Sequence, residues 1–257
     1  MSTVSANLER LRAIVAQLRD PDGGCPWDLE QTHRTLAPYL LEETYELLEA
    51  LEQAQDGAMR EELGDVLLQV VFHAQLASER GVFGLAEVVD DIADKMVRRH
   101  PHVFGDRTVG GAPEVQAAWE RAKQNAGKRV LDGVPAALPS LLRAHRLTAK
   151  AATVGFDWPD ATAVFDKVDE ELGELREAVT SGNLDSIEDE MGDMLFVLAN
   201  LARKLDVQPE IALRRTLTKF ERRFRYVEES LLGHGRHPRD ATLAEMDALW
   251  NEAKGKV

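Results

Sequence analysis

Apolar residues recur three or four positions apart along most of this chain, which is the period of an amphipathic α-helix. Two successive stripes consist of Val164, Val168, Leu172, Leu175 and Val179, and then of Met191, Met194, Leu195, Leu198 and Leu201. Strand signals are almost absent, so the sequence predicts an all-α fold of the four-helix-bundle type. Helices are expected at residues 5–19, 60–78, about 85–99, 140–152, 160–180, 184–205, from 209 onward and 242–254.

Four acidic residues border these two stripes. Glu171 and Glu174 lie three residues apart, as do Glu190 and Asp193, so each pair projects from one face of its helix. The intervening Ser181-Gly182-Asn183 ends a helix and favours a turn, so we expect the two helices to fold back antiparallel. The four carboxylates should then lie along one seam.

Carboxylates gathered at a partly buried seam repel one another. Two unit charges about 4 Å apart repel by roughly 1 kcal/mol in water and by about 4 kcal/mol at an effective dielectric constant near 20. A cation between them removes this cost, and all-oxygen ligation suits Mg²⁺ or Mn²⁺. A single acidic pair is weak support, because a chain with 45 acidic residues contains such pairs by chance, and most of them are solvated helix faces.

The arrangement occurs twice, however. Glu43, Glu46, Glu62 and Asp65 lie 128 residues before the four acids of the second half. Other features recur in the same order, namely GCPW and GFDW; Lys95, Arg98 and Arg99 with Lys219, Arg222 and Arg223; and Trp119 and Lys123 with Trp250 and Lys254. Internal duplication explains this order. The sequence therefore predicts domains at residues 1–124 and 139–257, joined by a linker with Gly and Pro at 125–138.

Composition narrows the range of partners and compartments. The 257 residues carry a formal net charge of −14, which argues against nucleic acid or an anionic membrane as the partner. Cys25 is the only cysteine, so no intrachain disulfide can form, and a reducing compartment fits. The sequence shows neither a secretory signal nor an apolar run of 18 residues. We expect a cytoplasmic protein, and we expect helices this apolar to associate as a homodimer.

Several cations accompany the acids of the second half. Lys167 lies one turn before the first acid, and Lys219, Arg222 and Arg223 follow on a later helix. Carboxylates, a divalent cation and basic side chains together suit phosphoryl chemistry, because the metal polarises phosphate oxygens while Lys and Arg bind them. Trp250 offers a flat ring on which a nucleobase can stack, although a tryptophan is more often a core residue. KFERRF by itself is also compatible with a solvated helix face.

The motifs together point to a family. GCPWD, LEETYE, ELGD, RRHPHVF, VGFDW, EMGD and KFERRF resemble the two-domain bacterial members of the MazG family of nucleoside triphosphate pyrophosphohydrolases, and the likeness extends from the first helix to the last. This resemblance implies an all-α, dimeric fold with tandem duplicated domains. It also implies Mg²⁺-dependent hydrolysis of NTPs or dNTPs to the monophosphate and pyrophosphate by a metal-activated water, as nucleotide-pool housekeeping, with Mn²⁺ as an alternative ion.

The same resemblance assigns roles to residues. Glu171, Glu174, Glu190 and Asp193 would be the metal ligands, and they form the catalytic set together with Lys219 and Arg222. The residues expected to bind the nucleotide are Lys167, Lys219, Arg222, Arg223, Trp250 and Lys254. A second metal set, weaker or silent, would consist of Glu43, Glu46, Glu62 and Asp65.

Both halves retain four acids, yet two differences favour the second half as the main active domain. Tyr39 stands where the second half has Lys167, so the first half lacks one phosphate contact. Pro38 is expected to begin its helix, which places Glu43 near the end of that helix. The resemblance agrees, because family members are similar in having the second domain as the dominant active unit.

Two other functions stay open at this point. One is a related all-α pyrophosphatase specialised for dUTP or phosphoribosyl-ATP. The other is a non-catalytic protein that binds a GTPase or a stress-response partner through its acidic helices. The duplicated acids, with their accompanying Lys and Arg, favour the enzyme.

Overall fold

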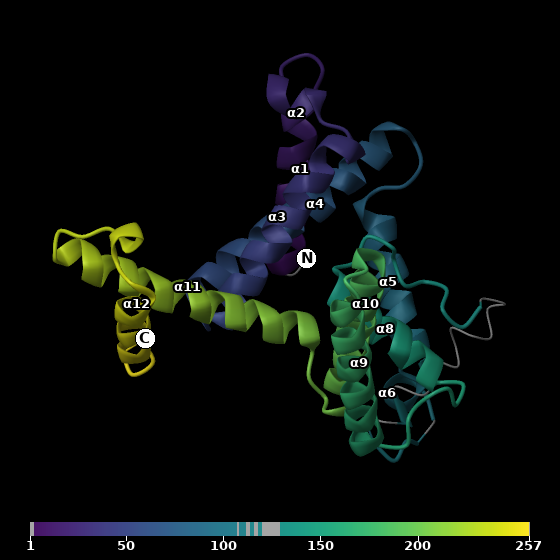
Figure 1. Cartoon of the computed structure of the whole chain (residues 1–257). Coiled ribbons are helices and arrows are strands. Elements are labelled where there is room, and N and C mark those ends of the chain that lie inside the picture. Colours follow the sequence, from purple (N-terminus) through teal and green to yellow (C-terminus); the bar gives the residue numbers. More distant parts are fainter. Residues whose placement is uncertain (1–2, 107, 112–113, 116–117, 120–128, 257) are drawn as a thin grey trace. The chain divides into compact units, whose positions relative to one another are not determined.

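The computed structural model describes residues 3–106, 108–111, 114–115, 118–119 and 129–256, and within these every regular element is a helix (Figure 1). The predicted all-α class is confirmed. The chain divides into two compact units, Met1–Gly110 and Gly111–Val257. The boundaries predicted at 124/125 and 138/139 stay a prediction: residues 125–128 of the expected linker lie outside the described residues, and residues 129–139 form turns and bends. In the described part of the chain, no helix combines the length and apolar character needed to cross a membrane.

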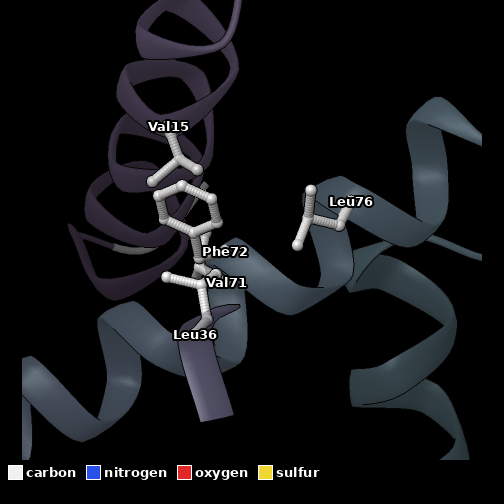
Figure 2. Close-up of a cluster of buried hydrophobic side chains, with 5 residues drawn as sticks. All are labelled: Val15, Leu36, Val71, Phe72 and Leu76. Carbon is white, nitrogen blue, oxygen red and sulfur yellow. The ribbon is translucent and has the colours of Figure 1, made fainter. Parts of the chain in front are cut away.

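The first unit is organised around one long helix. Its helices are α1 (Thr3–Leu18), α2 (Pro26–Glu30), α3 (His33–Glu52), α4 (Asp56–Glu79), α5 (Leu85–Arg99) and α6 (Pro101–Phe104). Both α1 and α3 pack against α4. The buried core where these three helices meet consists of Val15, Leu36, Val71, Phe72 and Leu76 (Figure 2). Val71, Phe72 and Leu76 of α4 therefore lie at the centre of this core.

Two local predictions for the first unit are wrong. Helix α3 begins at His33, and Pro38 lies inside it. The cause is a cap further upstream: Thr32 accepts a hydrogen bond from the backbone N–H of Thr35, and the Thr35 hydroxyl accepts one from the N–H of Thr32. Glu43 consequently sits mid-helix rather than near the end. The segment before α3 contains the short helix α2, which starts at Pro26.

The second unit repeats the acidic hairpin. Its helices are α8 (Ser140–Ala152), α9 (Ala161–Ser181), α10 (Leu184–Lys204), α11 (Pro209–Gly233), the short 3₁₀ helix η1 (Pro238–Asp240) and α12 (Leu243–Ala253). Helix α10 packs against α8 and α9, and α12 packs against α11. Val164, Val197 and Leu201 form the buried core, with Trp158 packed against it. The contact of Val164 with Val197 and Leu201 therefore fixes how α9 and α10 face each other. The stripes expected from the sequence are only partly buried, because Val179, Met191, Leu195 and Leu198 are exposed.

The turn between α9 and α10 confirms the predicted antiparallel hairpin. Gly182 adopts φ 71°, in the left-handed region that costs a glycine little, and its N–H bonds back to Ala178 and Val179. Asn183 then caps α10, because its side-chain oxygen accepts hydrogen bonds from the N–H groups of Asp185 and Ser186. One residue ends the first helix and the next begins the second.

Basic residues fix the loop that precedes each hairpin. In the first unit the buried Arg19 pairs with Glu79 at 2.7 Å and donates to the carbonyl of Asp28. In the second unit Arg203 and Lys204 both pair with Asp157. These contacts hold Asp28, which follows GCPW, and Asp157 of GFDW against neighbouring helices.

Gly24 is expected to be intolerant of a side chain. A Cβ at this position would lie 2.4 Å from the Leu18 carbonyl oxygen and 2.6 Å from that of Asp20, whereas a Cβ at Gly23 meets nothing within 4 Å. We expect Gly24→Ala to lower the free energy of unfolding by about 1–3 kcal/mol. Gly23→Ala, the matched control, should change it by less than about 0.5 kcal/mol. Urea denaturation followed by circular dichroism measures both, and equal losses would contradict the expectation.

Candidate metal centre

Three carboxylates converge between α9 and α10. One oxygen each from Glu171, Glu174 and Glu190 lies within 4.8 Å of the other two. Glu171 is buried, Glu190 is half-buried and Glu174 is exposed, so the group opens from the helix interface to solvent. We call these three residues the acidic trio. A group that is buried at its base and open at its mouth can hold a cation and still admit a ligand.

Asp193, the fourth predicted ligand, does not belong to this trio. Its side chain is exposed, one turn beyond Glu190 on α10. Its role in holding a metal therefore stays a prediction, although the i, i+3 spacing keeps it on the same face as Glu190.

Glu171 has two oxygens in different situations. The ammonium of Lys167 lies 2.8 Å from Oε1 and also pairs with Glu170 at 2.8 Å. Oε2 is buried and has no hydrogen-bond partner among the described residues. Hydrogen bonds to Glu170 and then to Glu171 raise the pKa of Lys167, so this cation is firmly charged. Burying a carboxylate oxygen without a partner costs free energy unless a cation or a hydrogen-bond donor reaches it. Oε2 is therefore the strongest structural indication that this site fits a cation.

Electrostatics in the trio also fit a cation. Burial raises the pKa of Glu174, and the neighbouring charge of Glu171 raises it further, while Lys167 acts in the opposite direction. The ionised form is thus disfavoured at the point where a divalent ion would need it. Oxygen ligands without Cys or His match Mg²⁺ or Mn²⁺, and binding would replace repulsion between carboxylates by attraction.

The first unit contains a corresponding group with a different neighbour. Glu43, Glu62 and Asp65 also bring ligand oxygens within 4.8 Å of one another. Burial, followed by the charges of Asp65 and Glu46, raises the pKa of Glu43; burial, followed by Glu46, raises that of Glu62. Glu46 thus acts on the group from the next turn. Tyr39 occupies the position of Lys167 and packs against Trp27, with ring centroids 5.8 Å apart. This acidic group has no equivalent of the Lys167 ammonium.

Apart from Lys167 on α9, the predicted nucleotide-binding residues lie on α11, on α12 or directly after α12. Lys219 and Arg222 are exposed on α11, and Lys254 follows α12 and donates to Asn251 at 2.7 Å. Arg223 and Trp250 are half-buried and contact each other, with Cζ of Arg223 5.8 Å from the indole centroid. Across the described part of the second unit, no ion pair joins Lys219, Arg222 or Arg223 to the acidic trio. Their roles in binding phosphate or base stay predictions.

Of the first-half counterparts, Lys123 lies outside the described residues, whereas Trp119 is half-buried. Lys95 and Arg98 of α5 line a cavity of about 640 Å³. Ile92 of the same helix and Phe83, which precedes it, also line this cavity. Sequence reasoning missed this cavity and also missed Glu170 as a partner of Lys167. The i, i+3 spacing of Lys167 and Glu170 could have predicted that these two residues form an ion pair.

Replacing Glu174 should stabilise the metal-free fold. Its raised pKa means that folding favours the protonated carboxyl; this contribution is present below the ordinary pKa of 4.5 and is lost as the pH rises through the folded value. At pH 7 the charged form opposes folding, so Glu174→Gln should raise Tm in chelator. Glu177→Gln, an exposed change on the same helix, is the control.

Calorimetry with and without Mg²⁺ measures this effect. Added Mg²⁺ should raise Tm of the unmodified chain more than that of Glu174→Gln. A lower Tm for Glu174→Gln in chelator, or an equal response of both proteins to Mg²⁺, would contradict the assignment.

Comparison with known proteins agrees with the geometry. The family model of the MazG nucleotide pyrophosphohydrolase domain matches residues 31–104 and 161–227, once in each half, which confirms the tandem repeat. A nucleoside triphosphate pyrophosphohydrolase of Escherichia coli (strain K12) is 45% identical over 254 residues, covering 96% of this chain and 97% of the relative. A nucleoside triphosphate pyrophosphohydrolase/pyrophosphatase MazG of Thermotoga maritima is 45% identical over 251 residues, covering 96% and 95%. This chain therefore belongs to the MazG nucleotide pyrophosphohydrolase family.

Proposed function

We propose that this protein hydrolyses nucleoside triphosphates to the monophosphate and pyrophosphate, and that the acidic trio of the second unit is its metal centre. Membership of the family supports the reaction, since the near-full-length relatives are named nucleoside triphosphate pyrophosphohydrolases. The observation that carries the site is the buried, unpartnered Oε2 of Glu171 beside the oxygens of Glu174 and Glu190. A cation bound to this oxygen would offset the free-energy cost of burying it without a partner.

The residues that would hold the ion are Glu171, Glu174 and Glu190, with Asp193 on the adjacent turn as a fourth ligand. Mg²⁺ is the proposed ion and Mn²⁺ its substitute, because both accept carboxylate oxygens. When bound, the ion supplies charge that polarises phosphate oxygens and lowers the pKa of a water molecule.

The remaining side chains position the substrate. Lys167 fixes Oε1 of Glu171 and leaves Oε2 for the ion, so it orients a ligand as well as lying near the phosphates. Lys219 and Arg222, exposed on α11, would bind the polyphosphate, Arg222 through paired donors and Lys219 as a point charge. Trp250 and Lys254 would complete the nucleotide pocket.

The second unit is the proposed main active unit. Its acidic trio is paired with Lys167, whereas the first unit has Tyr39 at the corresponding position, in contact with the ring of Trp27. Without that ammonium, the first group lacks both a charge that stabilises Glu43 as a carboxylate and a contact for phosphate. The first unit would therefore bind the ion and the substrate less well.

A homodimer is the proposed assembly. Five apolar side chains of α10 and α11 are between 41% and 54% exposed, namely Met191, Leu195, Leu198, Leu213 and Leu217. Covering such residues with a second copy removes apolar surface from water, and two-fold dimers are the commonest way to do so. Light scattering should give about twice the 28.6 kDa of one chain. A mass of one chain at tens of micromolar protein would rule the dimer out.

Product analysis tests the reaction and the assignment of the active unit. With Mg²⁺, the purified protein should release pyrophosphate and monophosphate from a panel of NTPs and dNTPs. Glu190→Gln should lower kcat/KM by about 100-fold or more, because it removes one charged ligand, whereas Glu62→Gln should retain most of the activity.

The panel also separates the competing functions. Cleavage of dUTP or phosphoribosyl-ATP alone would indicate a specialised pyrophosphatase. No pyrophosphate from any substrate would favour a non-catalytic binding protein. Near-complete loss of activity in Glu62→Gln, with Glu190→Gln active, would overturn the assignment to the second unit.

A further inference from the structure

Trp250 is held from α11 by two side chains. The guanidinium of Arg223 lies over the indole, with Cζ 5.8 Å from the ring centroid, which is within the range of a cation–π contact. The ring of Phe220, one turn earlier, lies 5.1 Å from the indole and is tilted by 52°. Phe220 in turn stacks on Phe224 at 6.0 Å. The orientation of Trp250 thus depends on side chains of a neighbouring helix.

Arg223 differs from the other cations of its helix. Lys219 and Arg222 are exposed, so their donors face solvent and any incoming phosphate. Arg223 is half-buried, and its Nε atom is buried without a hydrogen-bond partner among the described residues. Burial of Nε leaves the four N–H donors of the two Nη atoms, so Arg223 has fewer accessible donors than its exposed neighbours. Its flat face, in contrast, is engaged with the indole.

We propose that Arg223 is a positioning residue that acts through Trp250. It increases the affinity for the nucleoside part of the nucleotide rather than for the phosphates. This inference rests on the proposed function, because it takes Trp250 to contact the nucleoside. Arg223 and Phe220 hold the indole on α11, while Lys219 and Arg222 remain for the polyphosphate. Loss of Arg223 lets the indole turn and weakens stacking, and it leaves the charge that meets the phosphates in place.

Separate probes for the two ends of the nucleotide test this division. Calorimetric titration with Mg²⁺ gives the dissociation constants of inorganic pyrophosphate and of the best-bound of AMP, GMP, CMP and UMP. Arg223→Lys keeps the charge but loses the planar stack, and Arg223→Gln loses both. Both variants should raise the dissociation constant of the monophosphate about three- to tenfold and change that of pyrophosphate less than about twofold. Arg225→Gln, an exposed change two residues along α11, is the matched control.

A double-mutant cycle identifies the route of the effect. In a Trp250→Ala background, Arg223→Lys should no longer weaken binding of the monophosphate, because the ring that it positions is gone. Circular dichroism should show the same helix content for each variant. Each Arg223 variant is compared on two ligands. A general loss of fold would weaken binding of both ligands, whereas loss of positioning would weaken binding of the monophosphate alone.

Several results would overturn the proposal. One is that Arg223→Gln raises the dissociation constant of pyrophosphate as much as that of the monophosphate. Arg223 would then be a phosphate contact. Another is an unchanged monophosphate constant in both variants, or a full effect that persists without Trp250. A wild-type protein that binds nucleotide without hydrolysing it would end the proposed function, and the binding comparison would still decide the role of Arg223. A wild-type protein that binds no nucleotide would overturn both.

Discussion

Uncompensated negative charge between two packed helices is the constraint on which the second unit depends. Burial of Val164 against Val197 and Leu201 fixes the hairpin, and that packing brings the oxygens of Glu171, Glu174 and Glu190 together. The apolar contacts favour the arrangement while the carboxylates oppose it. Lys167 offsets part of this repulsion on one side of Glu171 and leaves the other side open. The fold therefore gathers carboxylates whose mutual repulsion a bound cation would relieve.

The two halves apply the same constraint with different neighbours. Each has an antiparallel acidic hairpin, and an arginine, Arg19 or Arg203, contacts an aspartate of the segment that precedes it. Only the second adds an ammonium one turn before its first acid. In the first, Tyr39 stands at that position and its ring contacts Trp27, and burial and the neighbouring acids raise the pKa of Glu43. The two halves therefore share the acidic hairpin but differ in the residue one turn before the first acid and in which acids converge.

Sequence periodicity could predict the hairpins because helix geometry follows from local spacing, and Gly182 with Asn183 specifies a turn from two adjacent residues. It could not predict that Thr32 and Thr35 would start α3 upstream of Pro38, because two competing start signals differ by small free energies. The burial of Glu171 and the exposure of Glu174 also escaped prediction. Both residues share one helix face, and only packing against α10 distinguishes them.

Two sets of opposite charge in the second unit, the acidic trio and the exposed cations of α11, are not paired with each other in the described structure. In the described structure Lys219 and Arg222 pair with no member of the acidic trio, although oppositely charged side chains in one compact unit attract. Direct pairing would satisfy both sets and leave neither for a ligand. A metal–triphosphate complex carries positive charge for the acids and negative charge for the bases, so it satisfies both sets at once. Trp250, held by Arg223, adds a contact that depends on neither charge. On the proposed assignment, a change at Arg223 would alter the affinity for the nucleoside. It would leave in place the acidic trio and the cations Lys219 and Arg222, which are proposed to bind the metal and the phosphates.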